Sequence, residues 1–227
     1  MGVLIEFFYG YPDDPMPPRL IHGHDILSGW NSLTGYSAKT GRPHDLRMNI
    51  KVCRLLGIKG ATAWWARTVA FDALIGNTDR HTENWGVLVA RQRSPERQRP
   101  VTAYAMAPAF DNATSLGYEI SDERLIKFQS SDALSSYIQR GTHHIAWSPE
   151  AAKGVQHGAL CKSLCEAVPS AGAAMLEVIR LTDSQVQGCT DRCIQFDVPH
   201  RFTRARGAFV QRLIRVRRDA LVAMLEG

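Results

Sequence analysis

The clearest apolar pattern in the sequence lies at residues 61–75, where apolar side chains fall on nearly every face of a helix. Its largest apolar members are Trp64, Trp65, Val69, Leu74 and Ile75. A helix that is apolar all round is typical of one buried in a core. Gly76 follows at once, as glycine often does at helix C-termini. The pattern therefore predicts a buried central helix that ends at residue 75.

A polar, turn-like loop at residues 77–84 comes next, and two β-prone segments follow it. These segments, residues 85–90 and 101–106, flank a charged stretch at residues 91–100. Two such runs on either side of a polar loop are typical of a β-hairpin. We therefore predict an antiparallel hairpin directly after the polar loop.

The rest of the chain has mostly helical character. Residues 48–56 and, more briefly, residues 25–30 favour helices, and the sequence after Leu125 looks helical with interruptions. The interruptions fall near residues 141–149, 169 and 197–199. At the start of the chain, residues 3–8 favour a strand, and a proline-rich stretch follows it. Together these patterns predict a mainly α-helical fold with a small β-hairpin.

The hairpin has a geometric consequence for the polar residues at its two ends. Because its strands run antiparallel, Asn84 before the first strand should lie beside Asp111 after the second. Asp79 belongs to the same short loop as Asn84. Mg²⁺ bound to nucleotide phosphates is usually held by one or two protein oxygen ligands. Asp79, Asn84 and Asp111 are therefore candidate cofactor-binding residues, with Asn84 and Asp111 as the metal ligands.

The same loop carries the candidate catalytic residues. In phosphoryl transfer a protein positions and neutralises groups more than it reacts with them, and Asp79 would orient the attacking hydroxyl. Arg80 and His81 follow it closely enough for either to touch a transferring phosphoryl oxygen. Asp and Asn are also common in turns, because they bond their own backbone. The combination of the buried helix, the polar loop, the hairpin and the Asp-Asn-Ala-Thr-Ser segment favours catalysis, with Asp79 and His81 as catalytic residues. The stretch around this last segment, residues 107–115, is called the acidic segment below.

Two segments resemble the HipA-like kinase family. Residues 71–84, FDALIGNTDRHTEN, resemble its catalytic loop, and residues 107–115, APAFDNATS, resemble its metal-binding segment. The core Asp-Arg-His-x-x-Asn is also similar, more distantly, to phosphatidylinositol kinases. The likeness covers most of residues 3–147 and fades afterwards.

The resemblance implies a protein-kinase-like C-terminal lobe, ATP and Mg²⁺ as co-substrates, and a protein serine or threonine as acceptor. Asp79 matches the family's catalytic Asp, Asn84 its metal-binding Asn, and Asp111 the Asp of the kinase Asp-Phe-Gly segment. One departure is Glu83, where many relatives place Lys or Gly. Its carboxylate could repel phosphates or face water, and we favour water.

The N-terminal ATP-binding lobe of such a kinase is expected to be largely absent. No Gly-rich phosphate loop precedes Asp79, and Lys39, Lys51 and Lys59 fall outside predicted strands. Residues 1–11 would suit a remnant, the last strand of that lobe and the hinge, within one unit spanning residues 1–227. We expect weak or no independent ATP turnover if the kinase is truncated. Alternatively, in a split kinase, a complementary lobe could arrive on another polypeptide.

Composition and charge limit the remaining options. The chain is 44% hydrophobic but lacks an apolar run long enough for a membrane span and a secretory signal, so the cytoplasm is the expected location. Five cysteines are expected to stay reduced. Cys161/Cys165 and Cys189/Cys193 share i,i+4 spacing, which allows a four-thiolate zinc site, but buried apolar cysteines are the favoured interpretation.

The net charge of +5 is concentrated near the C-terminus. The arginines there are Arg201, Arg204, Arg206, Arg212, Arg215, Arg217 and Arg218. They could contact nucleic acid, but we favour the solvated face of a helix. The other face of that helix would carry Phe209, Leu213, Val216 and Ala220.

Two hypotheses about function follow for the whole chain. In the first, the chain is part of a toxin-type kinase. The resemblance then implies a translation factor or tRNA synthetase as protein substrate and a helix-turn-helix antitoxin as partner. The alternative is a catalytically silent kinase-like module that docks a protein partner. Direct binding of nucleic acid ranks last.

Overall fold

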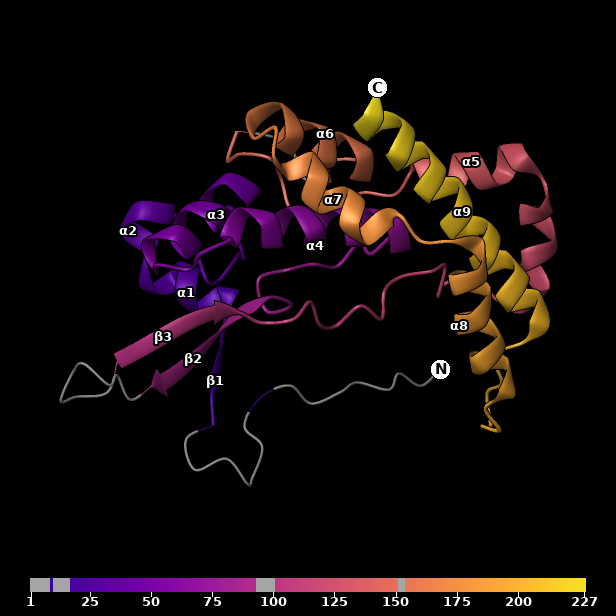
Figure 1. Ribbon diagram of the computed structural model, residues 1–227, viewed down its shortest axis with the longest axis horizontal. Coiled ribbons are helices and arrows are strands. Elements are labelled where there is room, and N and C mark those ends of the chain that lie inside the picture. Colours follow the sequence, from indigo (N-terminus) through magenta and orange to yellow (C-terminus); the bar gives the residue numbers. More distant parts are fainter. Residues whose placement is uncertain (1–8, 10–16, 93–100, 151–153) are drawn as a thin grey trace.

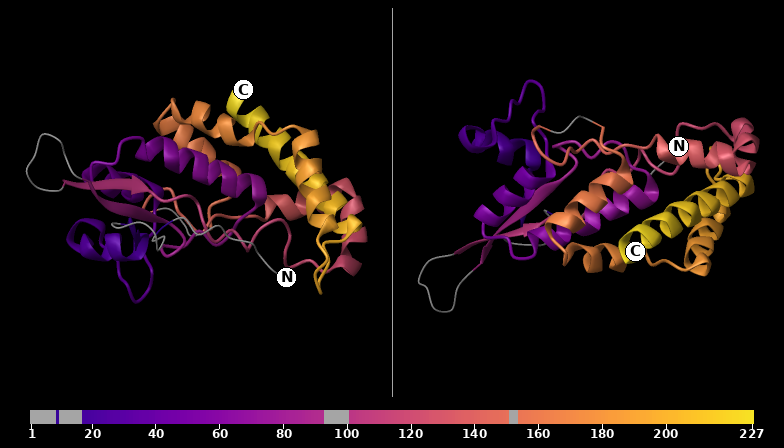
Figure 2. Two further views of the ribbon diagram at one scale, coloured as in Figure 1. Left: turned by 60° about the horizontal axis from the view of Figure 1, so that its bottom comes forward. Right: turned by 90° about the horizontal axis from the view of Figure 1, so that it is seen from above.

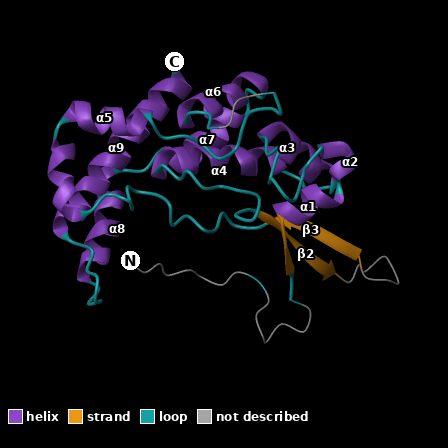
Figure 3. Ribbon diagram, turned by 180° about the vertical axis from the view of Figure 1, so that it is seen from behind, coloured by secondary structure: helices purple, strands orange, loops and turns teal. Residues whose placement is uncertain are grey.

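The computed structural model describes residues 9, 17–92, 101–150 and 154–227. Helices make up most of this structure, and a small antiparallel sheet lies at one end (Figures 1 and 3). α5 (Ser131–Gln139), α8 (Asp183–Gln195) and α9 (Arg204–Glu226) gather at the opposite end. The predicted mainly helical fold with a hairpin is confirmed. The predicted strand at residues 3–8 and most of the predicted hinge lie outside the described residues.

The sheet contains the predicted hairpin and one strand that was not predicted. β2 (Gly86–Gln92) pairs antiparallel with β3 (Val101–Met106), so the hairpin prediction is confirmed. β1 (Arg19–His22) pairs antiparallel with the other edge of β2. Glycine is required at Gly86, because a Cβ there would lie 2.5 Å from the Ile21 carbonyl oxygen. A residue with a side chain would therefore not fit at the start of β2 without a shift of the backbone.

The central helix of the fold is α4 (Ala61–Ile75), as predicted. It contacts helices from several parts of the chain, which bury it on nearly all sides. They include α3 (Leu46–Leu55), α6 (His157–Ala167), α7 (Ala171–Ile179) and α9. Trp65 of α4 and Trp85 are fully buried, and their ring centroids lie 5.0 Å apart. This aromatic contact holds the base of the hairpin against the central helix.

The smaller elements complete the described chain. They are α1 (Gly23–Gly29), α2 (Asn31–Thr34) and the 3-10 helix η1 (Asp122–Gln129). The predicted interruptions in the C-terminal half are confirmed, and a further one precedes α8. There Thr182 and Gln185 form a capping box that starts the new helix. None of the described helices is long and apolar enough to cross a lipid bilayer.

The prediction that the C-terminal arginines form a solvated face is wrong for several of them. Arg206 and Arg217 are buried, and Ala220 on the expected apolar face is exposed. Arg206 binds Asp122 and the carbonyl oxygens of Gly117 and Ile120. Arg215 and Arg218 both pair with Asp183. The reason is tertiary: α9 packs against η1 and α8, which supply acceptors to its basic side chains (Figure 2).

The cysteines are free thiols in unlike environments. Cys161 is buried, and burial raises the pKa of its thiol. Cys189 and Cys193 are exposed on α8, so the prediction of buried apolar cysteines is wrong for this pair. Within the described ranges, no group of three or more histidine, cysteine or acidic side chains could hold a metal ion. The four-thiolate zinc site is therefore not formed.

Candidate active site

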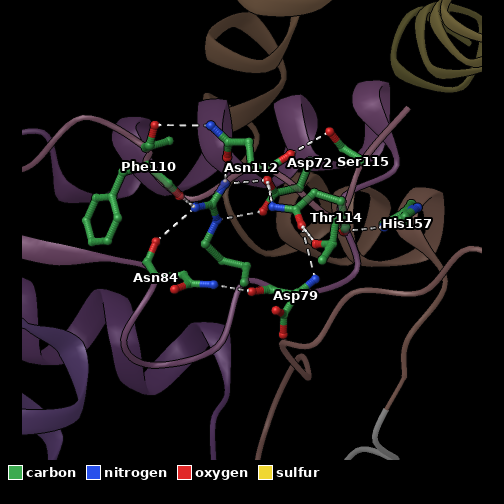
Figure 4. Close-up of polar contacts among 11 residues, drawn as sticks. Asp72, Asp79, Asn84, Phe110, Asn112, Thr114, Ser115 and His157 are labelled. Carbon is green, nitrogen blue, oxygen red and sulfur yellow. Dashed lines mark hydrogen bonds and ion pairs between the residues drawn. The ribbon is translucent and has the colours of Figure 1, made fainter. Parts of the chain in front are cut away.

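A buried ion pair lies at the centre of the candidate site (Figure 4). Asp72, in the last turn of α4, and Arg80, in the polar loop, both have fully buried side chains. Arg80 Nε donates to Asp72 Oδ2 at 3.0 Å, and Arg80 Nη2 donates to Asp72 Oδ1 at 2.7 Å. Two parallel bonds from a planar guanidinium fix both distance and orientation. The polar loop is thereby attached to the most buried helix of the fold.

Asn77 makes a second attachment between the loop and Asp72. Gly76 ends α4 in the left-handed conformation at φ 69°, which turns the chain back on itself. The Asn77 side chain then donates to Asp72 Oδ1 at 3.0 Å. Its own oxygen accepts from the Asp79 backbone N–H at 3.1 Å and from the Thr114 hydroxyl at 2.9 Å. Asn77 therefore sets the backbone of the candidate catalytic Asp79.

Arg80 also joins the polar loop to the segment after the hairpin. Its Nη1 donates to the Asn84 carbonyl oxygen at 2.8 Å and to the Phe110 carbonyl oxygen. Its Nη2 donates to the side-chain oxygen of Asn112. The two segments therefore meet. The hypothesis that Arg80 touches a transferring phosphoryl oxygen is wrong, because its guanidinium is enclosed and used by protein acceptors.

Asn84 presents its amide oxygen as a free ligand. Its Nδ2 donates to the Asp79 carbonyl oxygen at 2.7 Å. A carbonyl oxygen can only accept, so the amide nitrogen must face it and Oδ1 must point elsewhere. No hydrogen bond to Oδ1 is found among the described residues. The bond to the Asp79 backbone thus fixes the Asn84 side chain and leaves its oxygen available to a ligand.

The two carboxylates of the candidate site are open to solvent. The Asp79 side chain is 44% exposed, and His81 Nε2 lies 4.0 Å from its Oδ2. Asp111 is exposed, and its backbone adopts the left-handed region at φ 52°. Its neighbours on both sides, Phe110 and Asn112, bind Arg80. The structure brings Asp79 and Asn84 into direct contact, and Arg80 brings the segment that carries Asp111 against the same loop.

The chemistry of the predicted metal ligands suits Mg²⁺. The open carboxylate of Asp111 and the amide oxygen of Asn84 are hard oxygen ligands, which Mg²⁺ prefers. Because Mg²⁺ on a nucleotide takes the rest of its ligands from phosphates and water, a dedicated protein cage is not needed. The chemistry of Asn84 and Asp111 is therefore compatible with the metal ion that the family resemblance implies.

His81 belongs to the polar loop. Its Nδ1 accepts from the Glu83 backbone N–H at 3.2 Å, which leaves Nε2 as the N–H nitrogen, 4.0 Å from Asp79 Oδ2. The imidazole is 32% exposed. The Glu83 side chain is 65% exposed, which confirms that it faces water.

Two buried histidines, His143 and His157, lie beside the polar loop at Asn77. His157 Nε2 donates to the Asn77 carbonyl oxygen at 2.9 Å, and the His143 ring stands edge-on to His157 at 4.4 Å. Burial lowers the pKa of both imidazoles to about 3, and the Arg80 charge adds to the effect at His143. Both rings are therefore neutral near pH 7.

Sequence reasoning missed Asp72, Asn77 and His157 as parts of the site. Asp72 had a signal, since it is a lone carboxylate in an otherwise apolar stretch of helix. His157 had none, because it lies eighty positions from Asn77 in sequence and reaches it through the packing of α6.

With the fold and the site in place, the chain can be compared with known proteins. No protein-family model matches the sequence. A protein of Sinorhizobium fredii named "Putative kinase Y4dM" is 29% identical over 141 residues, which are 60% of this chain and 31% of that protein. The chain thus spans about a third of the length of this relative. The crystal structure of the Helicobacter pylori proinflammatory kinase CtkA matches with a TM-score of 0.67 and 16% identity, over 92% of this chain and 69% of that one.

These comparisons support a kinase-like family, through a sequence likeness to a protein named as a putative kinase and a fold likeness to a kinase. At 16% identity, the likeness to CtkA concerns the fold alone. The closer assignment to HipA-like kinases, the lobe boundaries and the residue roles stay predictions.

Proposed function

We propose that this chain carries the phosphoryl-transfer site of a HipA-like kinase, which moves the γ-phosphoryl group of ATP to a protein serine or threonine hydroxyl. One observation carries the proposal. Arg80 donates from a single nitrogen to the carbonyl oxygens of Asn84 and Phe110, so the base-bearing loop and the acidic segment share one place. Phosphoryl transfer depends on this convergence more than on any reactive side chain.

Each residue has a distinct role in this proposal. Asp79 orients the acceptor hydroxyl and accepts its proton. Asn84 Oδ1 and the Asp111 carboxylate hold Mg²⁺, which when bound neutralises charge on the phosphates. His81 places the Nε2 proton toward the Asp79 carboxylate, where it steadies the orientation of that side chain.

In this proposal a β-rich lobe completes the site by supplying the Gly-rich loop and the lysine that cradle ATP. The acceptor is a translation factor or tRNA synthetase, and a helix-turn-helix antitoxin restrains the activity. The resemblance of residues 71–84 and 107–115 to HipA-like kinases supports these assignments. The chain by itself is expected to transfer little γ-phosphate to generic protein acceptors.

The test is whether a magnesium nucleotide stabilises the purified chain. The probe is a non-hydrolysable ATP analogue at millimolar concentration, with and without Mg²⁺, and the readout is the melting temperature. At about 100 times Kd, binding adds about 2.7 kcal/mol, or roughly 5–10 °C for a chain of this size. The shift should depend on Mg²⁺ and vanish in Asp111→Asn and Asn84→Ala.

Two further variants complete the design. Asp79→Ala should keep the Mg²⁺-dependent shift and lose transfer once a complementary lobe is supplied. Asp191→Asn is the matched control, because Asp191 is an exposed carboxylate on α8. Absence of any Mg²⁺-dependent shift in the wild-type chain, both alone and with the complementary lobe supplied, would refute the kinase proposal and favour a docking module instead.

A further inference from the structure

Arg80 is a point of convergence among the described residues. Its Nε and Nη2 bind the two oxygens of Asp72, its Nη1 binds the carbonyl oxygens of Asn84 and Phe110, and Nη2 also binds Asn112. Every terminal nitrogen of the guanidinium thus reaches acceptors on more than one segment. Since the side chain is fully buried, these contacts are protected from competition with water.

Asp72 is the fixed end of this arrangement. It lies on α4, the helix that the rest of the core surrounds, and it is fully buried. The two bonds to this fixed carboxylate also fix the plane of the Arg80 guanidinium. The spacing between the Asn84 and Phe110 carbonyl groups is then set by one nitrogen atom bound to both.

The acidic segment gains two of its contacts to distant segments in this way. Asn112 bonds locally to Ala109, and Ser115 bonds locally to Asn112, so these bonds shape the segment without fixing its place. The contacts from Arg80 to Phe110 and Asn112 flank Asp111 and do fix it. An aspartate in the left-handed region needs such support from its surroundings.

We propose that Arg80, anchored on Asp72, is a positioning residue that sets the place of Asp111 relative to Asn84 without touching substrate or nucleotide. The inference rests on the proposed function for its purpose, since the two residues it aligns are the proposed metal ligands. Arginine is required because lysine offers one nitrogen and cannot bind Asp72 while also bridging two carbonyl groups. A partner behind the ligands typically contributes 10- to 100-fold to metal affinity.

The experiment compares Arg80→Met and Arg80→Lys with Arg206→Met. Arg206 is a matched control, because it is also buried and binds one carboxylate and two backbone carbonyl oxygens, but at η1. The first readout is the NMR backbone order parameter of residues 110–112 in the full chain. The second is binding of Mn²⁺ alone, followed by electron paramagnetic resonance.

The expected result separates the two arginines. In Arg80→Met, order parameters at residues 110–112 should fall from about 0.85 to below about 0.6, while those of α9 stay unchanged. Mn²⁺ affinity should fall about 10- to 100-fold, with Arg80→Lys in between. Arg206→Met should leave both readouts at wild-type values. Unchanged order at residues 110–112 in a folded Arg80 variant, or equal loss in the Arg206 variant, overturns the proposal.

Failures of the two proposals can be told apart. If the wild-type chain binds no Mn²⁺ at millimolar concentration, the proposed metal site fails, while the order parameters still decide the role of Arg80. If Arg80→Met does not fold, the double variant Asp72→Asn/Arg80→Gln is used, because it removes the Asp72 charge that Arg80→Met leaves buried and unpaired. The glutamine side chain at position 80 is too short to reach the Phe110 carbonyl oxygen. The double variant should fold with the same loss of order at residues 110–112, and wild-type order there refutes the inference.

Discussion

Replacement of Asp72 by Asn should cost much more stability than the same change at a partly exposed ion pair. Asp72→Asn keeps the side-chain volume and an oxygen for Asn77, but it leaves the Arg80 charge buried with no counterion. Loss of one partner from a buried pair costs about 3–5 kcal/mol. For a chain of 227 residues this corresponds to a fall in melting temperature of roughly 6–20 °C.

Asp122→Asn provides the comparison. Asp122 binds Arg206 in a similar way, but its side chain is 38% exposed, so water at this end of the pair can solvate the guanidinium after the carboxylate is lost. We expect a cost of about 1 kcal/mol. The assay is urea unfolding at pH 7, followed by both circular dichroism and tryptophan fluorescence to check two-state behaviour. Equal costs for the two variants would show that burial of the Asp72 pair does not govern its contribution.

Two further predictions concern acid stability and a glycine. His143 and His157 have folded pKa values of about 3, against 6.5 when unfolded, so stability should fall as pH drops below 6.5, by about 2 kcal/mol per histidine at pH 5. Urea midpoints at pH 7.5 and 5 measure this, and a pH dependence that persists unchanged in His143→Leu contradicts it. Gly76→Ala should cost about 2–4 kcal/mol of stability, because the left-handed backbone is strained for alanine and the new Cβ would overlap the buried Arg217 guanidinium. Gly57→Ala has the same backbone strain but open space around the Cβ, so it should cost about 1 kcal/mol. Similar unfolding free energies for the two glycine variants would refute the overlap.

Local patterns were sufficient to predict the central helix, the hairpin and the meeting of their flanking loops. The apolar run at residues 61–75 specifies a buried helix whatever surrounds it, and Gly76 ends it by its own backbone freedom. Antiparallel pairing then brings residues at the two ends of the hairpin together. These are short-range consequences of residue type and spacing.

Other features depend on contacts that the local pattern does not contain. β1 is four residues long, and it is a strand because β2, more than sixty positions away, supplies its hydrogen-bond partners. The arginine helix shows the same limit. Helical periodicity predicts which side chains share a face, but the packing of η1 and α8 decides whether that face meets water or acceptors.

Chain order and the hairpin, both predicted from the sequence by itself, place the segments that carry Asp79, Asn84 and Asp111 at one end of the sheet. That these three residues form one site stays a prediction. Only the tertiary structure decided the role of Arg80. Beside a candidate catalytic residue, an arginine would suit a phosphate ligand, but the buried carboxylate of Asp72 turns it inward. A buried charge is costly unless an opposite charge lies beside it, and only the folded structure shows which side chain provides that charge.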